Sequence, residues 1–187
     1  MALSNTEKVI VIQYDGTEIT LKEWQKLYGL EIGSDQIGKY FSLNGDPRLL
    51  RDVLEYGKVK VAEPLILFLD LLRKELAKPL VITSFNRSHA KQLQLRKAGY
   101  KTAKYSPHEV CLAADIDCKT EAETRLFALT AKKVAEKACL KVRVGSEQYI
   151  KNGQTFIHVD VCPEYFGSGK PWAGKQHPFQ WEEVNNW

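Results

Sequence analysis

Cysteine is scarce in this chain of 187 residues, and its spacing excludes two kinds of site. No two of the four cysteines form a C-x-x-C pair, so a zinc ribbon and a redox-active dithiol are both disfavoured. Free cysteine is often buried, and no oxidising compartment is indicated. We therefore expect all four to be reduced residues of the hydrophobic core, namely Cys111, Cys118, Cys139 and Cys162.

The sequence also has no long apolar run. Its longest apolar patch, P-L-I-L-F-L-D-L-L-R, is interrupted by Asp70 and is too short to span a bilayer. The first residues, M-A-L-S-N-T-E-K, have neither the positive flank nor the apolar core of a signal peptide. We expect a soluble protein without a signal peptide, made in the cytoplasm and not inserted into a membrane.

Charge of one sign is not concentrated anywhere along the chain. The 27 basic and 23 acidic residues leave a formal net charge of +4, spread without blocks. This mild excess suits an acidic partner but does not require nucleic acid, and no nucleic-acid-binding motif is present. A hydrophobic share of 44% and a charged share of 27% are typical of a globular protein, which we expect to be a monomer.

Helix and strand patterns are mixed along the chain rather than strictly alternating, which predicts an α+β fold. A capping-box pattern from Thr20 to Glu23 starts a short helix near Leu21. In the helix expected at 62–76, apolar spacing places Asp70 on the side away from the core. Further helices are expected at 88–98 and 121–138, and strands at 8–14, 80–84, 111–117, 141–144 and 155–161.

Three parts are predicted along the chain. Residues 1–45 form an N-terminal strand–turn–helix extension, and residues 46–165 form the core that carries the chemistry. Residues 166–187, which are rich in Gly, Pro and Trp, are expected to pack on this core as a tail.

Polar residues interrupt two of the apolar strand patterns. The stretch S-P-H-E-V-C-L-A-A-D-I-D contains His108 and Asp115, and T-F-I-H-V-D-V contains His158 and Asp160 on one face of a strand. A buried carboxylate needs a compensating partner, and a cation is one candidate. Two imidazoles and one carboxylate are a typical ligand set of a catalytic zinc, which predicts a site of His108, Asp115 and His158. Spacing alone leaves open that these are ordinary core or surface residues, as we expect of His89 and His177.

Three ordered motifs resemble those of the M15 zinc peptidases, which include D-Ala-D-Ala carboxypeptidases, peptidoglycan endopeptidases and phage endolysins. Ser106-x-His108-x-x-Cys111-x-Ala113-x-Asp115-Ile116 is similar to the family motif S-x-H-x-x-G-x-A-x-D-I. The stretch 156–160, F-I-H-V-D, is similar to the family strand that ends in H-V-D. The stretch 84–88, S-F-N-R-S, is a looser match to S-G-Y-R-S. The resemblance covers roughly residues 60 to 165.

The resemblance implies a hedgehog/D-Ala-D-Ala-peptidase-like fold, with a small central antiparallel sheet and flanking helices. It implies Zn²⁺ held by His108, Asp115 and His158, with Arg87 anchoring the bound peptide and Ser106 bonding to it. The implied activity is hydrolysis of peptidoglycan stem peptides, as a carboxypeptidase or an endopeptidase. Together with the N-terminus, it suggests a phage or prophage lysin that acts at the cell wall after release or as part of a phage particle.

The sequence departs from the family pattern in three places. Cys111 stands where the family has Gly, which predicts a backbone without positive φ there. Phe85 and Asn86 replace Gly-Tyr, which changes the substrate cleft.

The third departure concerns the general base, because Thr155 occupies the position of the family's acidic residue and follows Gln154. Asp160 is our candidate for the base, with support of a histidine ligand as its other role. Glu147 and Tyr149 are further candidates. Alternatives are a catalytically inactive zinc-containing module that binds peptidoglycan or belongs to a phage particle, and a metal-free structural domain.

Overall fold

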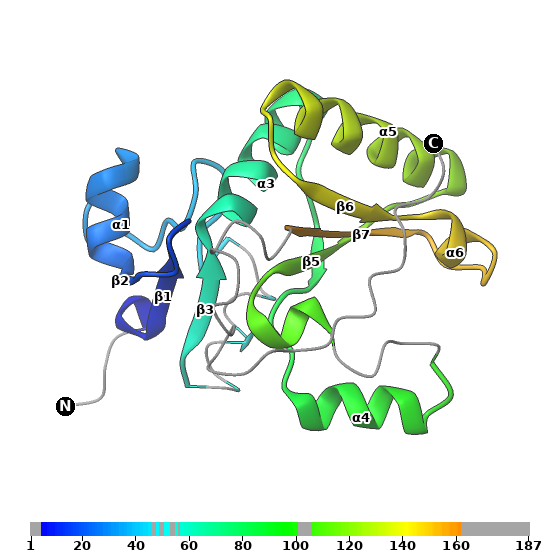
Figure 1. Cartoon of the computed structure of the whole chain (residues 1–187), viewed down its shortest axis with the longest axis horizontal. Coiled ribbons are helices and arrows are strands. Elements are labelled where there is room, and N and C mark those ends of the chain that lie inside the picture. The colour runs from blue at the N-terminus through cyan, green and yellow to red at the C-terminus, as the bar shows by residue number, and fades with distance from the viewer. Residues whose placement is uncertain are drawn as a thin grey trace.

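The computed structural model describes residues 5–45, 48, 51, 52, 55, 57–100 and 106–161. Two sheets and the helices around them form an α+β fold, as predicted (Figure 1). The elements in chain order are η1 (Asn5–Lys8), β1 (Val9–Ile12), β2 (Glu18–Thr20), α1 (Leu21–Tyr28), β3 (Val59–Ala62), α3 (Glu63–Leu76), β4 (Ile82–Ser84), α4 (His89–Lys97), η2 (Pro107–Val110), β5 (Ala113–Asp117), α5 (Glu121–Lys137), β6 (Val142–Gly145), α6 (Glu147–Ile150) and β7 (Phe156–Val161).

The smaller sheet has the strand order β2-β1-β3. Strands β1 and β2 form an antiparallel hairpin whose turn contains Gly16 at a φ of 85°, a conformation that favours glycine. Thr20 then caps α1, and its reciprocal bonds with Glu23 confirm the predicted capping box. Strand β3 pairs in parallel with β1 and continues directly into α3. Neither β2 nor β3 was predicted from the sequence.

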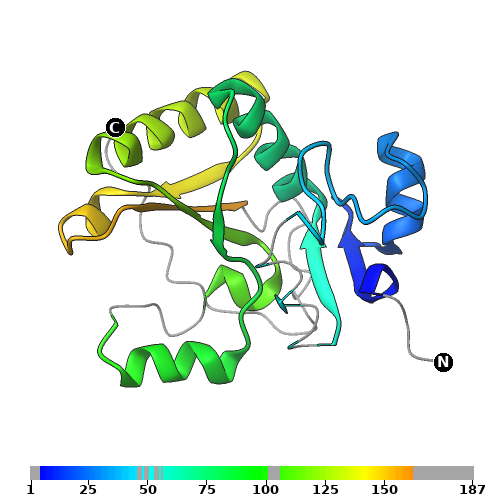
Figure 2. The ribbon, with the colours of Figure 1, turned by 180° about the vertical axis from the view of Figure 1, so that it is seen from behind.

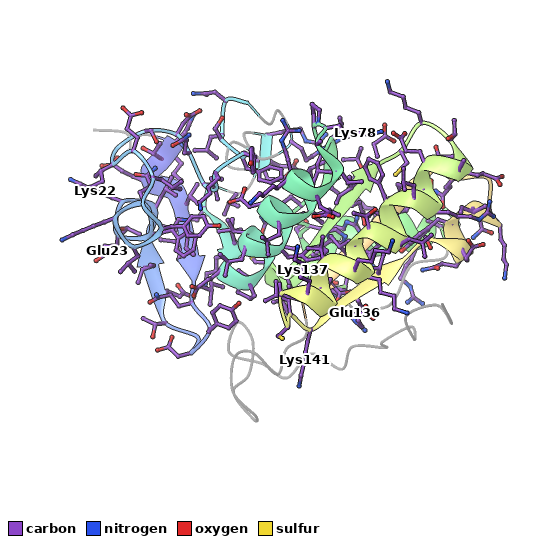
Figure 3. The ribbon with its side chains drawn as sticks, turned by 90° about the horizontal axis from the view of Figure 1, so that it is seen from above. Lys22, Glu23, Lys78, Glu136, Lys137 and Lys141 are labelled. Atoms are coloured by element: carbon purple, nitrogen blue, oxygen red, sulfur yellow. The ribbon has the colours of Figure 1, made fainter. Side chains whose placement is uncertain are left out.

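The larger sheet is antiparallel, with the order β4-β5-β7-β6. Its apolar side chains point to one face, which α3 and α5 cover, while α4 lies on the opposite side (Figures 1 and 2). Seen from above, α3 and α5 lie side by side, and Glu136 and Lys137 project from the outer part of α5 (Figure 3). The second face of the sheet is therefore left for polar side chains.

Asp70 is buried rather than on the exposed side of α3, which corrects the prediction for this residue. Its carboxylate is 4% exposed and accepts hydrogen bonds from the backbone N–H groups of Lys39 and Tyr40 and from the Tyr28 hydroxyl. Helical periodicity missed this role because the donors belong to α1 and to a loop, both distant in the sequence. The contact joins the N-terminal segment to α3, and one hydrophobic core spans both sheets.

The cysteine prediction is confirmed in part. Cys111 and Cys118 are free and buried, whereas Cys139 is free but exposed. Cys139 follows the end of α5 with a φ of 53°, so it belongs to the turn that leaves the helix and not to the core. Cys162 and the predicted tail at 166–187 lie outside the described residues. None of the described helices is long and apolar enough to cross a membrane.

Candidate metal centre

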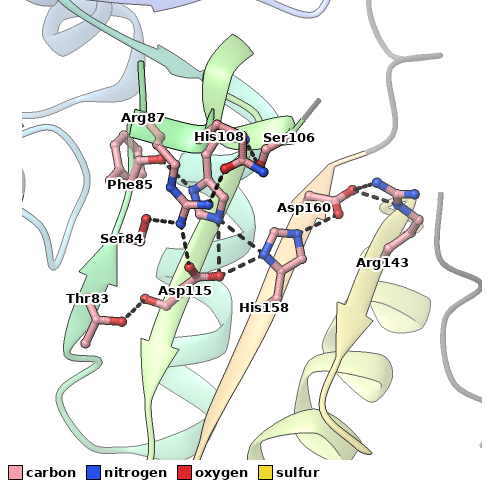
Figure 4. A network of polar contacts seen from close by, with 11 residues as sticks. Thr83, Ser84, Phe85, Arg87, Ser106, His108, Asp115, Arg143, His158 and Asp160 are labelled. Atoms are coloured by element: carbon pink, nitrogen blue, oxygen red, sulfur yellow. Dashed lines mark hydrogen bonds and ion pairs between the residues drawn. The ribbon is translucent and has the colours of Figure 1, made fainter. Parts of the chain in front are cut away.

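Strand pairing brings the predicted ligands together on the polar face of the larger sheet. Asp115 of β5 lies directly opposite His158 of β7, and His108 reaches them from η2, just before β5 (Figure 4). The residues beside this group in the same row of the sheet are Ser84 on one side and Gly145 on the other. A bond from the Val161 N–H to the Leu112 carbonyl continues the pairing beyond β5.

One nitrogen of each histidine and one oxygen of Asp115 converge on the same point. His108 Nε2 lies 3.2 Å from Asp115 Oδ1 and 3.3 Å from His158 Nδ1, and His158 Nδ1 lies 2.8 Å from Asp115 Oδ1. Tetrahedral zinc with ligands at about 2.0–2.2 Å holds its ligand atoms about 3.4 Å apart. A small outward movement of these three atoms is enough to fit the ion.

The outer nitrogen of each histidine has its own acceptor, which fixes the tautomer of His108 and orients the ring of His158. His108 Nδ1 lies 2.7 Å from the Phe85 carbonyl oxygen and must donate to it, because a carbonyl only accepts. His158 Nε2 lies 3.0 Å from Asp160 Oδ2 and donates to that carboxylate. His108 Nε2 and His158 Nδ1 therefore face each other and Asp115, and both can present a lone pair to an ion. Three converging acceptors require a cation or an added proton, so the donor set fits zinc.

The pKa values follow from this arrangement. Burial opposes protonation of His158, but hydrogen bonds to Asp115 and Asp160 outweigh it and raise its pKa to about 9. Burial lowers the pKa of His108, which is 2% exposed, against the attraction of Asp115. Burial also acts to raise the pKa of Asp115, yet His108 and His158 hold that pKa well below its usual range. Asp115 and Asp160 thus favour positive charge on or beside His158.

Arg87 braces Asp115 from the side opposite the histidines. Its Nη2 donates to Asp115 Oδ2 at 3.2 Å and to the Ser84 hydroxyl at 2.7 Å, and its Nη1 donates to Gln92 of α4 at 2.9 Å. The Arg87 N–H also bonds to the His108 carbonyl oxygen. The predicted substrate anchor therefore lies in the site, where it also holds the carboxylate of a candidate ligand.

Asp160 uses both carboxylate oxygens within the protein. Oδ2 accepts from His158, and Oδ1 lies 2.8 Å from both Nε and Nη2 of Arg143. The side chain is 2% exposed. This geometry favours support of His158, the second of the two roles considered for Asp160, over that of a general base.

Cys111 has a φ of 66°, so the prediction that this backbone avoids positive φ is wrong. The residue ends η2 and its N–H bonds to the Pro107 carbonyl oxygen, a position at which helices commonly adopt the left-handed conformation. The Cys111 thiol lies 2.9 Å from Asn86 Oδ1, and burial raises its pKa to about 12. Two departures from the family pattern, at 86 and 111, are thus in contact.

The other candidates occupy different places. Ser106 is buried, accepts the His108 N–H at its hydroxyl oxygen and lines the cleft beside it. Tyr149 also lines the cleft, where its ring packs on Phe156. Glu147 turns away and pairs with Arg125 of α5 at 2.9 Å. His89, expected to be an ordinary surface residue, is exposed but bonds to Glu109 of η2.

The converging ligands lie in a cleft of about 640 Å³. Gln92, Leu95 and Tyr100 form the wall at α4, and Tyr149 and Phe156 belong to the wall at α6. Among the described residues that line the cleft, Asp115 and Asp160 carry the carboxylates, and Gln154 is present near the family's base position. The cleft is large enough for a short peptide segment.

Sequence reasoning missed Ser84, Gln92 and Arg143 as parts of the site. Arg143 had a usable signal, because it alternates with Val142 and Val144 in a predicted strand and so points to the polar face. Ser84 had one too, as the first residue of the S-F-N-R-S motif, whereas Gln92 had none, since its role depends on how Arg87 is oriented.

No protein-family model matches the chain, and no curated protein matches its sequence significantly. Among solved structures, the chain is similar to the crystal structure of the L-Ala D-Glu endopeptidase ChiX of Serratia marcescens. The two share 21% sequence identity with a TM-score of 0.46, over 55% of this chain and 80% of the other. At this level of similarity, a functional assignment depends on the site residues themselves.

Proposed function

We propose that this chain is a zinc-dependent peptidase of the M15 type that hydrolyses peptide bonds in peptidoglycan stem peptides. The observation that carries the proposal is the convergence of His108, Asp115 and His158, whose ligand atoms all lie within 4.8 Å of one another in a peptide-sized cleft. The resemblance of the three sequence motifs supplies the substrate class. The proposed place of action is the cell wall, reached as a phage or prophage lysin or on a phage particle.

The proposal gives the residues of the cleft separate roles in metal binding and substrate binding. His108 Nε2, His158 Nδ1 and Asp115 would hold the ion, leaving its fourth position open. Bound zinc polarises a scissile carbonyl and lowers the pKa of water to about 7. Arg87 has a planar fork suited to a carboxylate or carbonyl of the peptide, next to the metal ligand that it braces. Ser106 lines the cleft at the start of η2 and would bond to the peptide.

The proton acceptor separates the main proposal from its alternative. Hydrolysis needs a group that takes a proton from water and returns one to the leaving amine. Thr155 is not acidic, and Asp160 is engaged by His158 and Arg143. This observation favours a second candidate, a zinc-containing module that binds peptidoglycan or forms part of a phage particle without cleaving the wall.

One experiment separates these candidates. Purified sacculi are incubated with the protein in zinc, and turbidity and the masses of released peptides are followed with and without a chelator. A peptidase releases stem-peptide fragments, loses this activity with the chelator and regains it with zinc. A binding module co-sediments with sacculi and releases nothing. A protein that binds no zinc by elemental analysis contradicts both.

Asp160→Asn resolves the role of this carboxylate. A general base is indicated by normal zinc content and loss of the acidic limb of the pH–rate profile. Support of His158 is indicated by weaker zinc binding and recovery of activity in excess zinc. A variant as active as the parent at every pH excludes both roles.

A further inference from the structure

Arg143 lies at the far end of the polar network, two steps from the candidate metal. It belongs to β6 and stands directly opposite Asp160 of β7, so strand pairing sets the two side chains on the same face (Figure 4). Val142 and Val144 point to the other face of β6 by alternation. The position of Arg143 is therefore fixed by the sheet.

The contact between Arg143 and Asp160 is a charge-assisted fork. Both Nε and Nη2 of the guanidinium lie 2.8 Å from Asp160 Oδ1. The carboxylate is 2% exposed, and the guanidinium side chain is 19% exposed. Water screens such a contact poorly, and with Oδ1 held by Arg143 and Oδ2 held by His158 the carboxylate cannot rotate freely.

The orientation of that carboxylate determines which nitrogen of His158 faces the metal. Arg143 holds Oδ1 of Asp160. The other oxygen, Oδ2, lies 3.0 Å from His158 Nε2 and accepts a hydrogen bond from it. The other nitrogen, Nδ1, then lies 2.8 Å from Asp115 Oδ1, where it can serve as the ligand atom of the proposed ion. If Asp160 turned, His158 would lose both its tautomer and the orientation of its ring.

We propose that Arg143 is a positioning residue that sets the zinc affinity of the site through Asp160 and His158, without touching metal or substrate. This inference rests on the proposed function, because it takes His158 as a zinc ligand. It parallels Arg87, which braces Asp115 at the other end of the network. Asp115 would then depend on Arg87, and His158 would depend on Arg143 through Asp160.

The test measures zinc affinity of the full chain by competition with a chelator of known affinity at fixed pH. Supporting residues of this kind change metal affinity by about 10–100-fold, so we expect Arg143→Met to lose about tenfold. Arg143→Lys keeps the charge but not the fork, and should fall between the parent and Arg143→Met. Arg125→Met is the matched control, since Arg125 pairs with Glu121 and Glu147 on the exposed surface, and it should bind zinc as the parent does.

A double-mutant cycle shows whether Arg143 acts through Asp160. In the Asp160→Asn background, Arg143→Met should cause little further loss, because the path to His158 is already broken. Additive losses overturn the proposed route, even if each single variant weakens binding. Thermal unfolding of the metal-free variants checks that they fold; if Arg143→Met does not, Arg143→Lys and the double variant, which buries no lone carboxylate, decide the question.

The outcomes also distinguish a failure of this inference from a failure of the proposed function on which it rests. If the parent binds no zinc, the proposed function fails. If the parent binds one zinc and Arg143→Met binds it with equal affinity, the role of Arg143 alone is rejected and the metal site stands.

Discussion

Two buried aspartates, Asp70 of α3 and Asp115 of β5, have different hydrogen-bonding partners. Asp70 is 4% exposed and accepts hydrogen bonds from two backbone N–H groups, at 2.7 and 3.1 Å, and from a tyrosine hydroxyl at 3.1 Å. Asp115 is 9% exposed and lies between a guanidinium and two imidazoles. Burial raises the pKa of Asp70, whereas the histidines hold the pKa of Asp115 well below its usual range.

The difference distinguishes a structural carboxylate from one prepared for a cation. The donors around Asp70 are neutral, and they satisfy it within the fold. Around Asp115, two histidines turn one nitrogen each toward its oxygen, because Phe85 and Asp160 take their other nitrogens. Such a buried group needs positive charge among its members. Asp70 thus holds the N-terminal segment in place, and Asp115 has the surroundings that the proposed metal ligand needs.

The largest effect on zinc binding is expected from Asp115→Asn. Loss of the charged ligand should weaken zinc binding by more than about 100-fold, because about 100-fold is the largest loss typical of residues that only support a ligand. Zinc at about 100 times its dissociation constant stabilises the parent by about 2.7 kcal/mol, and this stabilisation should vanish. Chelator competition and thermal unfolding with and without zinc measure both. Asp117→Asn, at an exposed position of the same strand, should behave as the parent.

Asp70→Ala should act on stability and not on metal binding. It leaves two backbone N–H groups and a hydroxyl without their acceptor, which we expect to cost about 3 kcal/mol. Urea unfolding should show the same loss with and without zinc, and the zinc affinity of the folded variant should be unchanged. Glu75→Ala, on an exposed position of α3, is the control. A fall in zinc affinity would remove the distinction between the two aspartates.

Arg87→Lys tests the charged partner of Asp115. Lysine keeps the charge but cannot bond to Asp115, Ser84 and Gln92 in one plane, so we expect about tenfold weaker zinc binding. Activity measured at saturating zinc then isolates the substrate role. Recovery of full activity there means that Arg87 only braces the metal ligand, and a persistent loss means that it also binds the peptide.

Tyr28→Phe tests the neutral partner of Asp70 and should have the smallest effect. Removing one of three donors to a carboxylate should cost about 1 kcal/mol, with the backbone donors left in place. Urea unfolding of parent and variant measures it. A loss as large as that of Asp70→Ala would mean that the hydroxyl, and not the backbone, secures Asp70.

The sequence was a good guide where the information is local. Helical spacing placed α3, α4 and α5, and strand alternation put His158 and Asp160 on one face. The convergence of His108, Asp115 and His158 was predicted because motif order and strand pairing agree.

The sequence was a poor guide where a contact between residues far apart in the chain determines the structure. The loop that bonds to Asp70 lies about 30 residues away in the sequence, and the spacing of apolar residues in α3 does not indicate this contact. The left-handed Cys111 follows from how η2 ends, which overrides the residue's own preference. Arg143 faces Asp160 only through the register of β6 on β7.

The most direct test of the metal site is a crystal structure of the zinc-loaded protein with anomalous scattering at the zinc edge. One anomalous peak is expected, at about 2.0–2.2 Å from His108 Nε2, Asp115 Oδ1 and His158 Nδ1, with His158 Nε2 still bonded to Asp160. A peak elsewhere, or a His158 that presents Nε2 to the ion, contradicts the account.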